Sequence, residues 1–406
     1  MLTSTITSRG QTRHAQPAPP IQGSAMHEMF TMLMNPDLLS FALGLPAPEL
    51  FPIANYREAA IRVLDTDPQA LQYQVRPGPL KRHLQQLMAS RGVNCREDQI
   101  FLTAGAQQAT HLLVNLLLER GAQTLFEEVT YEGLHLALQP LRPQSIIAPT
   151  RVETGIDLDV VEDQLKRGAR PTFIYTITDG HNPLGLSLSQ AARIRLIELA
   201  RRFRVPIVED DVFGLLNYDG PALSPMRALD DEWVFYIGSF SKILAPALRV
   251  GWIIAPEAFK PSLSFLKNAS DLDLTTFSQF TLSGYLDTGA MPDHLATLRR
   301  EYGMRRDLML RALESSFPFE ARWLKPTCGM FIWVELPPRI NSVELLRMAV
   351  ETERVAFMPG VSFSPPGGPC ARNGIRLNFT HCQPQLIEDG IARLARVLKR
   401  ALARNG

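Results

Sequence analysis

The sequence has few cysteines and no excess of charge of either sign. The four cysteines are scattered through 406 residues, without a Cys-x-x-Cys pair or a histidine at zinc spacing. This spacing argues against a disulfide framework and against a structural zinc, and we expect no metal site. The 42 Lys and Arg nearly balance the 41 Asp and Glu. That balance removes the main electrostatic reason to expect a nucleic-acid or acidic-membrane partner.

Long apolar runs are also missing. The run at 112–118 is interrupted by Asn115 and is far too short to span a membrane. The N-terminus lacks the apolar core of a secretory signal. Residues 1–20 contain three prolines and no acidic residue, which predicts a disordered arm rather than a transit peptide. Together these absences predict a cytoplasmic protein.

From about residue 100, the chain alternates strand patterns with helix patterns. Helical spacing of apolar residues predicts helices at 106–120 and 190–203. β-Branched and aromatic residues predict strands at 100–103, 172–177, 206–208, 234–237 and 250–254. This alternation predicts an α/β fold with a mostly parallel central sheet flanked by helices. Ligands bind such sheets at the carboxyl ends of the strands.

A lysine follows the strand predicted at 234–237. Lys242 lies close to Ser239 and Ser241, and Arg249 comes seven residues later. No Gly-x-x-x-x-Gly-Lys pattern surrounds it, so a P-loop is excluded. A lysine there can form a Schiff base with an aldehyde cofactor, while the hydroxyls and the arginine hold its phosphate. The alternative is a solvated surface lysine.

Three other strand ends carry groups that could bind the same cofactor as Lys242. The first opens a helix with small residues that let backbone N–H groups approach an anion, namely Gly105 and Ala106 followed by Gln107. Asn182 lies in an Asn-Pro-x-Gly turn that would hold its amide rigidly. Asp210 can cap a helix, bind a metal or pair with a protonated ring nitrogen. Each signal is weak alone, but together they meet the requirements of pyridoxal 5′-phosphate (PLP).

These motifs resemble those of the fold-type I PLP enzymes of aminotransferase class I/II. The resemblance is closest to the aminoadipate/kynurenine aminotransferase branch, whose catalytic domain also occurs in MocR-type regulators, and it extends from about residue 22 to the C-terminus. It implies that Lys242 forms the Schiff base and that Asp210 holds the pyridinium. It places Asn182 at the cofactor O3′. The phosphate would be held by Ser239, Ser241, Arg249 and the loop at 105–107.

The resemblance also assigns residues that the strand ends do not reveal. Tyr131 matches the aromatic residue that stacks on the cofactor ring, and Arg376 matches the arginine that binds the substrate α-carboxylate. Gly44 belongs to the segment that lines the substrate side. Tyr73 matches a tyrosine that reaches the partner subunit's phosphate, which implies a homodimer.

The sequence pattern and the resemblance together predict four segments along the chain. Residues 1–20 are the disordered arm, and 21–53 join the small domain and cover the active site. Residues 54–290 form the large PLP-binding domain, and 291–406 form a smaller α+β domain. Glu28 lies on the covering helix, and we hypothesise that Glu28 or Asp179 favours a basic or polar substrate. The alternative is that both side chains are simply solvated and do not contact the substrate.

The resemblance implies transfer of the α-amino group of an L-amino acid to a 2-oxo acid. The sequence departs from the family pattern at two places, and these departures leave other functions open. Phe213 stands where the family has a tyrosine, and the Asn-Pro turn is altered. One alternative is a PLP enzyme of another reaction type, such as an oxidase or hydroxylase, elimination, cyclisation or carbon–carbon bond formation in secondary metabolism. The other alternative is a non-enzymatic module that binds PLP as an effector. The intact set of Lys242, Asp210 and Arg376 favours catalysis.

Overall fold

The computed structural model describes residues 35 and 37–404, except 74–77, 152–153 and 366–370. The arm predicted at 1–20 and the helix predicted to carry Glu28 lie outside the described residues. Among the described residues, no helix is both long and apolar enough to cross a membrane.

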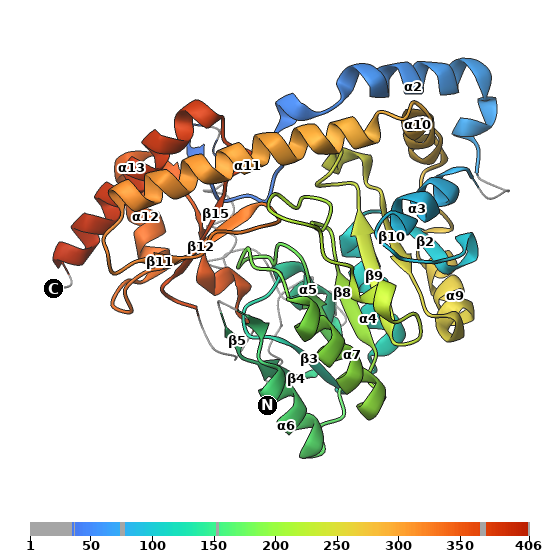
Figure 1. The fold of residues 1–406 in the computed structure, drawn as a ribbon, viewed down its shortest axis with the longest axis horizontal. Coiled ribbons are helices and arrows are strands. Elements are labelled where there is room, and N and C mark those ends of the chain that lie inside the picture. Colours follow the sequence, from blue (N-terminus) through green and yellow to red (C-terminus); the bar gives the residue numbers. More distant parts are fainter. Residues whose placement is uncertain (1–34, 36, 74–77, 152–153, 366–370, 405–406) are drawn as a thin grey trace, which may run out of the picture.

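A seven-stranded sheet forms the centre of the larger part (Figure 1). Its order is β2 (Ile100–Thr103), β10 (Gly251–Ile254), β9 (Val234–Ser239), β8 (Ile207–Asp210), β7 (Ile174–Ile177), β3 (Gln123–Glu127) and β4 (Gln144–Ala148). Only β10 runs antiparallel to its neighbours. The predicted α/β fold with a mostly parallel sheet is confirmed.

Helices cover both faces of this sheet because alternate strand residues point to opposite sides. Phe235 of β9 packs in one apolar cluster with α4 (Ala106–Leu117), α5 (Glu132–Leu138) and α9 (Lys260–Asp271). Its neighbour Val234 packs in the other cluster, with α6 (Leu158–Lys166), α7 (Gln190–Phe203) and α8 (Met226–Leu229). Because β9 is buried on both faces, the residues of its sequence from Val234 to Ile237 are all apolar or aromatic rather than alternating with polar ones.

Three further helices extend this part at one corner of the molecule. They are α2 (Ile53–Thr66), α3 (Leu80–Ala89) and α10 (Thr276–Asp287). Gly284 of α10 leaves room for Ala59 and Val63 of α2. This corner carries several exposed apolar side chains, from α2, α9 and the segment after α2.

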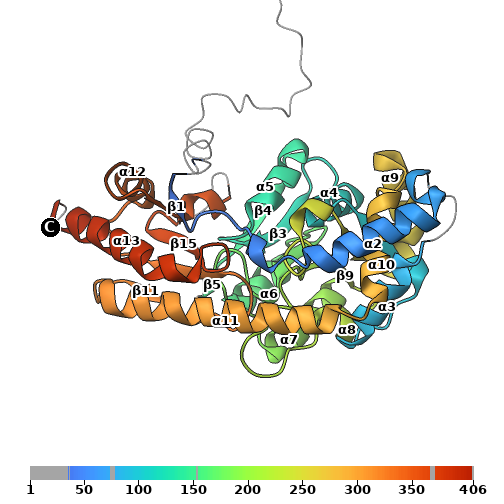
Figure 2. The same cartoon turned by 90° about the horizontal axis from the view of Figure 1, so that it is seen from above.

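A second, antiparallel sheet forms the smaller part, with the order β11 (Arg322–Trp323), β12 (Phe331–Glu335), β15 (Gly374–Asn378) and β14 (Met358–Pro359). The long helices α11 (Met291–Ser316), α12 (Ser342–Glu353) and α13 (Pro384–Arg404) lie around it (Figure 2). A short two-stranded sheet joins β5 (Thr150–Arg151) to β6 (Gly155–Ile156).

The start of the described chain returns to this smaller part. β1 (Leu39–Ser40) pairs in parallel with β13 (Val355–Ala356), and the amide of Phe41 donates to the carbonyl of Ala356. The chain from Ala42 to Gly44 therefore runs beside β15. The domain boundary near residue 290 stays a prediction; α10 ends at Asp287 and α11 begins at Met291.

Candidate active site

One cavity of about 250 Å³ lies at the carboxyl ends of the parallel strands. Ile177, Asp210 and Ser239, which end β7, β8 and β9, all line it. The structure brings most of the predicted site residues to this cavity: Gly44, Ala106, Gln107, Tyr131, Asn182, Asp210, Ser239, Ser241, Lys242, Arg249 and Arg376. Gly105 lies directly before the lining residue Ala106.

Lys242 follows β9 and is the only lysine among the lining residues of this described cavity. Its Nζ donates to the carbonyl oxygen of Gly44 at 2.7 Å. Desolvation lowers the pKa of Lys242 to about 8, and the positive charge of Arg376 acts in the same direction. A neutral amine is therefore accessible near physiological pH, and a neutral amine can act as nucleophile or base.

Asp210 ends β8 and is almost fully buried. The hydroxyl of Tyr175, from the neighbouring strand β7, donates to its Oδ2 at 2.6 Å. Its Oδ1 has no hydrogen-bond partner among the described residues. Burial raises the pKa of Asp210 to about 6, although the Tyr175 hydrogen bond opposes the rise. A buried oxygen without a donor suits a ligand that brings a cationic N–H.

Arg376 comes from β15 and brings a buried guanidinium into the same cavity. Its Nη1 donates to Asn182 Oδ1 at 2.7 Å, and its Nη2 donates to the carbonyl of Ala42 at 2.6 Å. The guanidinium carbon lies 4.2 Å from the ring centre of Phe331 and 4.7 Å from that of Phe363. Desolvation lowers the pKa of Arg376 to about 10. Since these hydrogen-bond partners are neutral and no ion pair of 4 Å or less reaches Arg376 among the described residues, an incoming carboxylate would supply a direct countercharge.

Four residues form a candidate anion cradle beside the first turn of α4. Gly105 adopts φ 83° and precedes this turn. Arg249 Nη2 donates to the carbonyl of Ala104 at 2.7 Å. Ser239 Oγ donates to Ser241 Oγ at 3.0 Å and accepts from the Ser241 amide at 3.1 Å. Helix N-termini and arginines both favour bound phosphate.

Gly105→Ala is expected to damage this cradle. Gly105 has φ 83° and ψ 174°, a conformation that costs about 1–3 kcal/mol for a side-chain-bearing residue, and a Cβ here would lie 2.5 Å from Arg249 Nη2. We expect a lower melting temperature and roughly tenfold or greater loss of affinity for PLP, measured by equilibrium titration. Gly121→Ala is the matched control, because Gly121 has φ 78° but no atom within 4 Å of an added Cβ. Equal PLP affinity in the two variants would contradict the assignment.

Tyr131 and Gln107 are fixed against each other at one wall of the cavity. The Tyr131 hydroxyl donates to Gln107 Oε1 at 3.0 Å, and Gln107 Nε2 donates to the carbonyl of Gly133 at 2.9 Å. Desolvation and the nearby Glu132 raise the pKa of Tyr131. The phenol therefore stays protonated and keeps this hydrogen bond.

Two predicted residues lie away from the cavity. Tyr73 is 79% exposed and does not line it. Asp179 is buried, and its carboxylate accepts from Arg193 at 2.7 Å and lies 3.5 Å from Arg91. The hypothesis that Asp179 contacts the substrate is therefore wrong, because two arginines already occupy this carboxylate. Glu28 lies outside the described residues.

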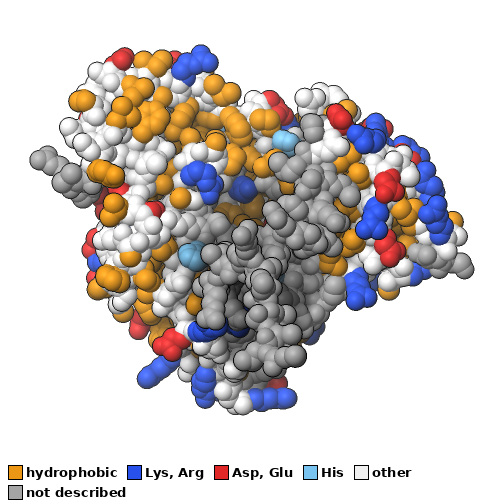
Figure 3. Space-filling model, turned by 180° about the vertical axis from the view of Figure 1, so that it is seen from behind, with side chains coloured by type: hydrophobic (Ala, Val, Ile, Leu, Met, Phe, Trp, Pro, Cys, Tyr) orange, Lys and Arg blue, Asp and Glu red, His pale blue; other side chains and the backbone are white. Residues whose placement is uncertain are grey.

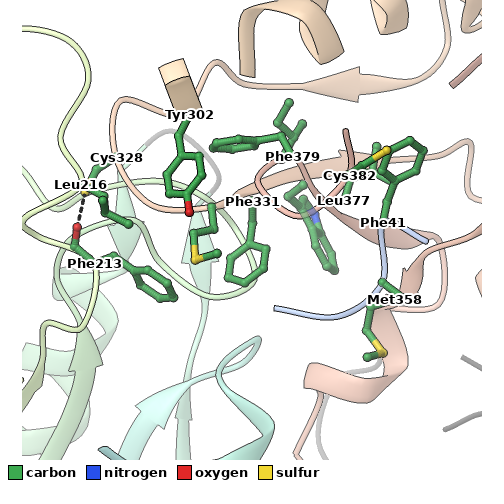
Figure 4. Packing of buried hydrophobic residues seen from close by; sticks show 14 of the residues in the cluster. Phe41, Phe213, Leu216, Tyr302, Cys328, Phe331, Met358, Leu377, Phe379 and Cys382 are labelled. Carbon is green, nitrogen blue, oxygen red and sulfur yellow. Dashed lines mark hydrogen bonds between the residues drawn. The ribbon is translucent and has the colours of Figure 1, made fainter. Parts of the chain in front are cut away.

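Phe213 belongs to an aromatic wall of the cavity. Its ring meets Phe331 edge to face, with centroids 5.7 Å apart and an interplanar angle of 82° (Figure 4). Cys328 Sγ donates to the carbonyl of Phe213 at 3.1 Å. Phe213 and Cys328 are therefore in direct contact.

Sequence reasoning missed three residues that shape the site: Glu132, Tyr175 and Phe331. Glu132 directly follows Tyr131 and lines the cavity. Tyr175 lies within the strand predicted at 172–177. The sequence does not show that this strand pairs with β8, and it is this pairing, with Ile177 opposite Asp210, that brings Tyr175 close to Asp210. Adjacency to Tyr131 was the one sequence signal that could have indicated Glu132.

The chain resembles known proteins over nearly its whole length. Residues 41–394 match the family described as aminotransferase class I and II. Aromatic-amino-acid aminotransferase 1 from Thermococcus litoralis is 36% identical, covering 93% of this chain and 92% of that protein. Two solved structures are also similar. Kynurenine aminotransferase from Pyrococcus horikoshii, solved in complex with PMP, has 34% identity and a TM-score of 0.87, with 94% and 96% of the two chains covered. LysN, an α-aminoadipate aminotransferase from Thermus thermophilus solved with N-(5′-phosphopyridoxyl)-L-leucine, has 35% identity and a TM-score of 0.85, with 95% and 96% covered.

Proposed function

The chain belongs to the class I and II aminotransferases, and from that premise we propose which of its residues carry out the transfer. The fold, the PLP cofactor and the amino-group transfer predicted from the sequence are confirmed. One observation carries the residue assignment: a lysine amine, a buried carboxylate and a buried arginine line a single cavity beside a helix N-terminus. When bound, PLP supplies an aldehyde carbon and an electron-withdrawing ring.

The residues of the cavity fit PLP. Asp210 Oδ1 lacks a hydrogen-bond donor, and a protonated ring nitrogen would provide one. Asn182 uses its Oδ1 to accept from Arg376, so its amide nitrogen is left to donate to an oxygen of the cofactor. Gly105 keeps the space beside Arg249 free of a side chain. Ser239, Ser241 and Arg249 would then hold the phosphate, and Tyr131 would lie against the ring.

Each protein group would then have a defined task in the reaction, and Lys242 would have two. Arg376 would bind the α-carboxylate of an L-amino acid, using the orientation that Phe331 and Phe363 impose on its guanidinium. Lys242 would bind PLP covalently at rest. Once free, its Nζ would take the proton from Cα of the amino donor and give it up again. Asp210 would stay ionised to keep a positive charge on the ring nitrogen.

The pH dependence of covalent PLP capture tests the state of Lys242. Only the neutral amine attacks an aldehyde. Because the pKa of Lys242 is lowered to about 8, the capture rate should rise from pH 6 to pH 9 with its inflection near pH 8. Borohydride fixation at timed intervals, followed by peptide mass spectrometry, measures this rate. An inflection at pH 10 or above, the range of an ordinary lysine, would rule out the lowered pKa.

A spectroscopic titration with amino donors tests the function itself. The PLP-loaded protein is mixed with each amino acid in a panel that includes ornithine, kynurenine and aminoadipate, and visible absorbance is followed in air. Amino-group transfer bleaches the visible band, and a 2-oxo acid restores it. Oxygen consumption without bleaching would instead favour the other reaction types that the altered turn and Phe213 leave open.

A homodimer is the assembly that the surface favours. Figure 3 shows apolar side chains gathered on the corner formed by α2, α9 and α10. Leu71, Tyr73 and Phe265, at this corner, are more than 70% exposed. Apolar groups of this number on one face are typical of an interface. Tyr73 would then reach the partner's phosphate, and a monomer by light scattering of the PLP-loaded protein would contradict this proposal. The cytoplasmic location stays a prediction.

A further inference from the structure

Glu132 is a carboxylate of the cavity that the reaction described above does not use. It is the first residue of α5 and lines the same cavity as Lys242 and Arg376. Its Oε2 is buried and has no hydrogen-bond partner in the described part of the chain. Asp210, the other carboxylate lining the cavity, differs because it accepts from Tyr175.

The surroundings of Glu132 give it no evident structural task. Within the described residues no ion pair of 4 Å or less reaches it, although Arg376 and Lys242 are close enough for its charge to favour their protonated forms. Its negative charge also raises the pKa of Tyr131. A buried carboxylate oxygen without a donor costs free energy unless a ligand compensates it. Its position at the start of α5 lowers this cost but supplies no partner.

We propose that Glu132 selects amino donors whose side chain carries an ammonium or guanidinium group, and that it disfavours dicarboxylic donors. This inference rests on the proposed function, because Arg376 must hold the α-carboxylate. A cationic side chain would then meet Glu132 in the same cavity, whereas a second carboxylate would be repelled. The basic-substrate preference that the sequence suggested for Glu28 or Asp179 is thus assigned to a different carboxylate.

Unreactive ligands test this selection without turnover. The protein in its pyridoxamine 5′-phosphate form is titrated calorimetrically with 5-guanidinopentanoate, hexanoate and adipate, which share a carboxylate and differ in the charge of the far end. We expect 5-guanidinopentanoate to bind roughly tenfold or more tightly than adipate. Glu132→Gln should weaken 5-guanidinopentanoate about tenfold and change hexanoate less than about twofold. Glu119→Gln, an exposed glutamate, is the control and should leave all three affinities unchanged.

The possible results separate the two proposals. If the unmodified protein binds adipate as tightly as 5-guanidinopentanoate, or Glu132→Gln leaves their ratio unchanged, the role of Glu132 is wrong. The ligand series on the unmodified protein decides this even if Glu132→Gln does not fold. Failure of the proposed function has another signature: no amino acid of the panel, charged or neutral, is converted in the presence of PLP and a 2-oxo acid.

Discussion

Lys242→Ala is expected to lower the rate of amino-group transfer by roughly 10³-fold or more. General acid–base catalysis alone contributes about 10²–10⁴-fold, and this variant also loses the covalent attachment of PLP. Lys242 is the only lysine among the residues that line the cavity, so no described neighbour can replace its Nζ. The measurement is the rate of 2-oxo acid formation at saturating donor, with PLP in excess.

Two controls separate the chemistry of Lys242 from its packing. Lys325→Ala changes a half-exposed lysine that pairs with Asp219 and Asp307 and does not line the cavity, and it should leave the rate unchanged. Added methylamine should restore part of the activity of Lys242→Ala, because a small amine can take up the proton in place of Nζ. Near-normal turnover of the variant without added amine would remove Lys242 from the mechanism.

Asp210→Asn is expected to lower kcat by about 10²–10³-fold, the usual effect of removing one fixed electrostatic partner. Asparagine is close to aspartate in size and can still accept the Tyr175 hydrogen bond, so the packing should be preserved. The neutral amide cannot hold a positive charge on the ring nitrogen, and the ring then withdraws electrons less strongly. Steady-state kinetics and the melting temperature of the PLP-loaded variant provide the measurement.

Tyr175→Phe is a milder change at the same site. It keeps the carboxylate but removes the hydroxyl that donates to Asp210 Oδ2. We expect a loss of about ten- to a hundredfold, smaller than that of Asp210→Asn, because one hydrogen bond to a charged group contributes about 1.5–3 kcal/mol and each 1.4 kcal/mol is about tenfold in rate. If Tyr175→Phe lowered kcat as much as Asp210→Asn, the charge of Asp210 would not be the decisive property.

The sequence predicts the elements of the central sheet closely because their patterns are local. The helix predicted at 190–203 matches α7 (Gln190–Phe203), and the strand predicted at 100–103 matches β2. The side chain of Ser189 caps α7, and Arg204 ends it in the left-handed conformation, so both boundaries have a local cause. The helix predicted at 106–120 ends earlier, at Leu117. Helix α11 also has a local start, because it begins at Met291 with Pro292 in its first turn.

Site residues were predictable where they follow a strand, and less so where distant segments meet. Lys242, Asp210 and Asn182 all follow or end strands of one sheet, so their convergence follows from topology. The partners of Arg376 could not be read from local pattern, because Asn182 and Ala42 reach it from other parts of the chain. Asp179 illustrates the opposite error: it lies close to Asn182 in sequence, but Arg193 and Arg91 bind it in the interior.

The pairing of β1 with β13 has a consequence for how the protein is made. A ribosome releases Leu39 early and Val355 late, after most of the chain has emerged. All seven strands of the central sheet are complete at Ile254, so that sheet can assemble during synthesis. The carbonyls of Ala42 and Gly44, which accept from Arg376 and Lys242, follow β1 directly. They take their places only when the last quarter of the chain arrives, so the cavity around Lys242 and Arg376 is complete only once translation has finished.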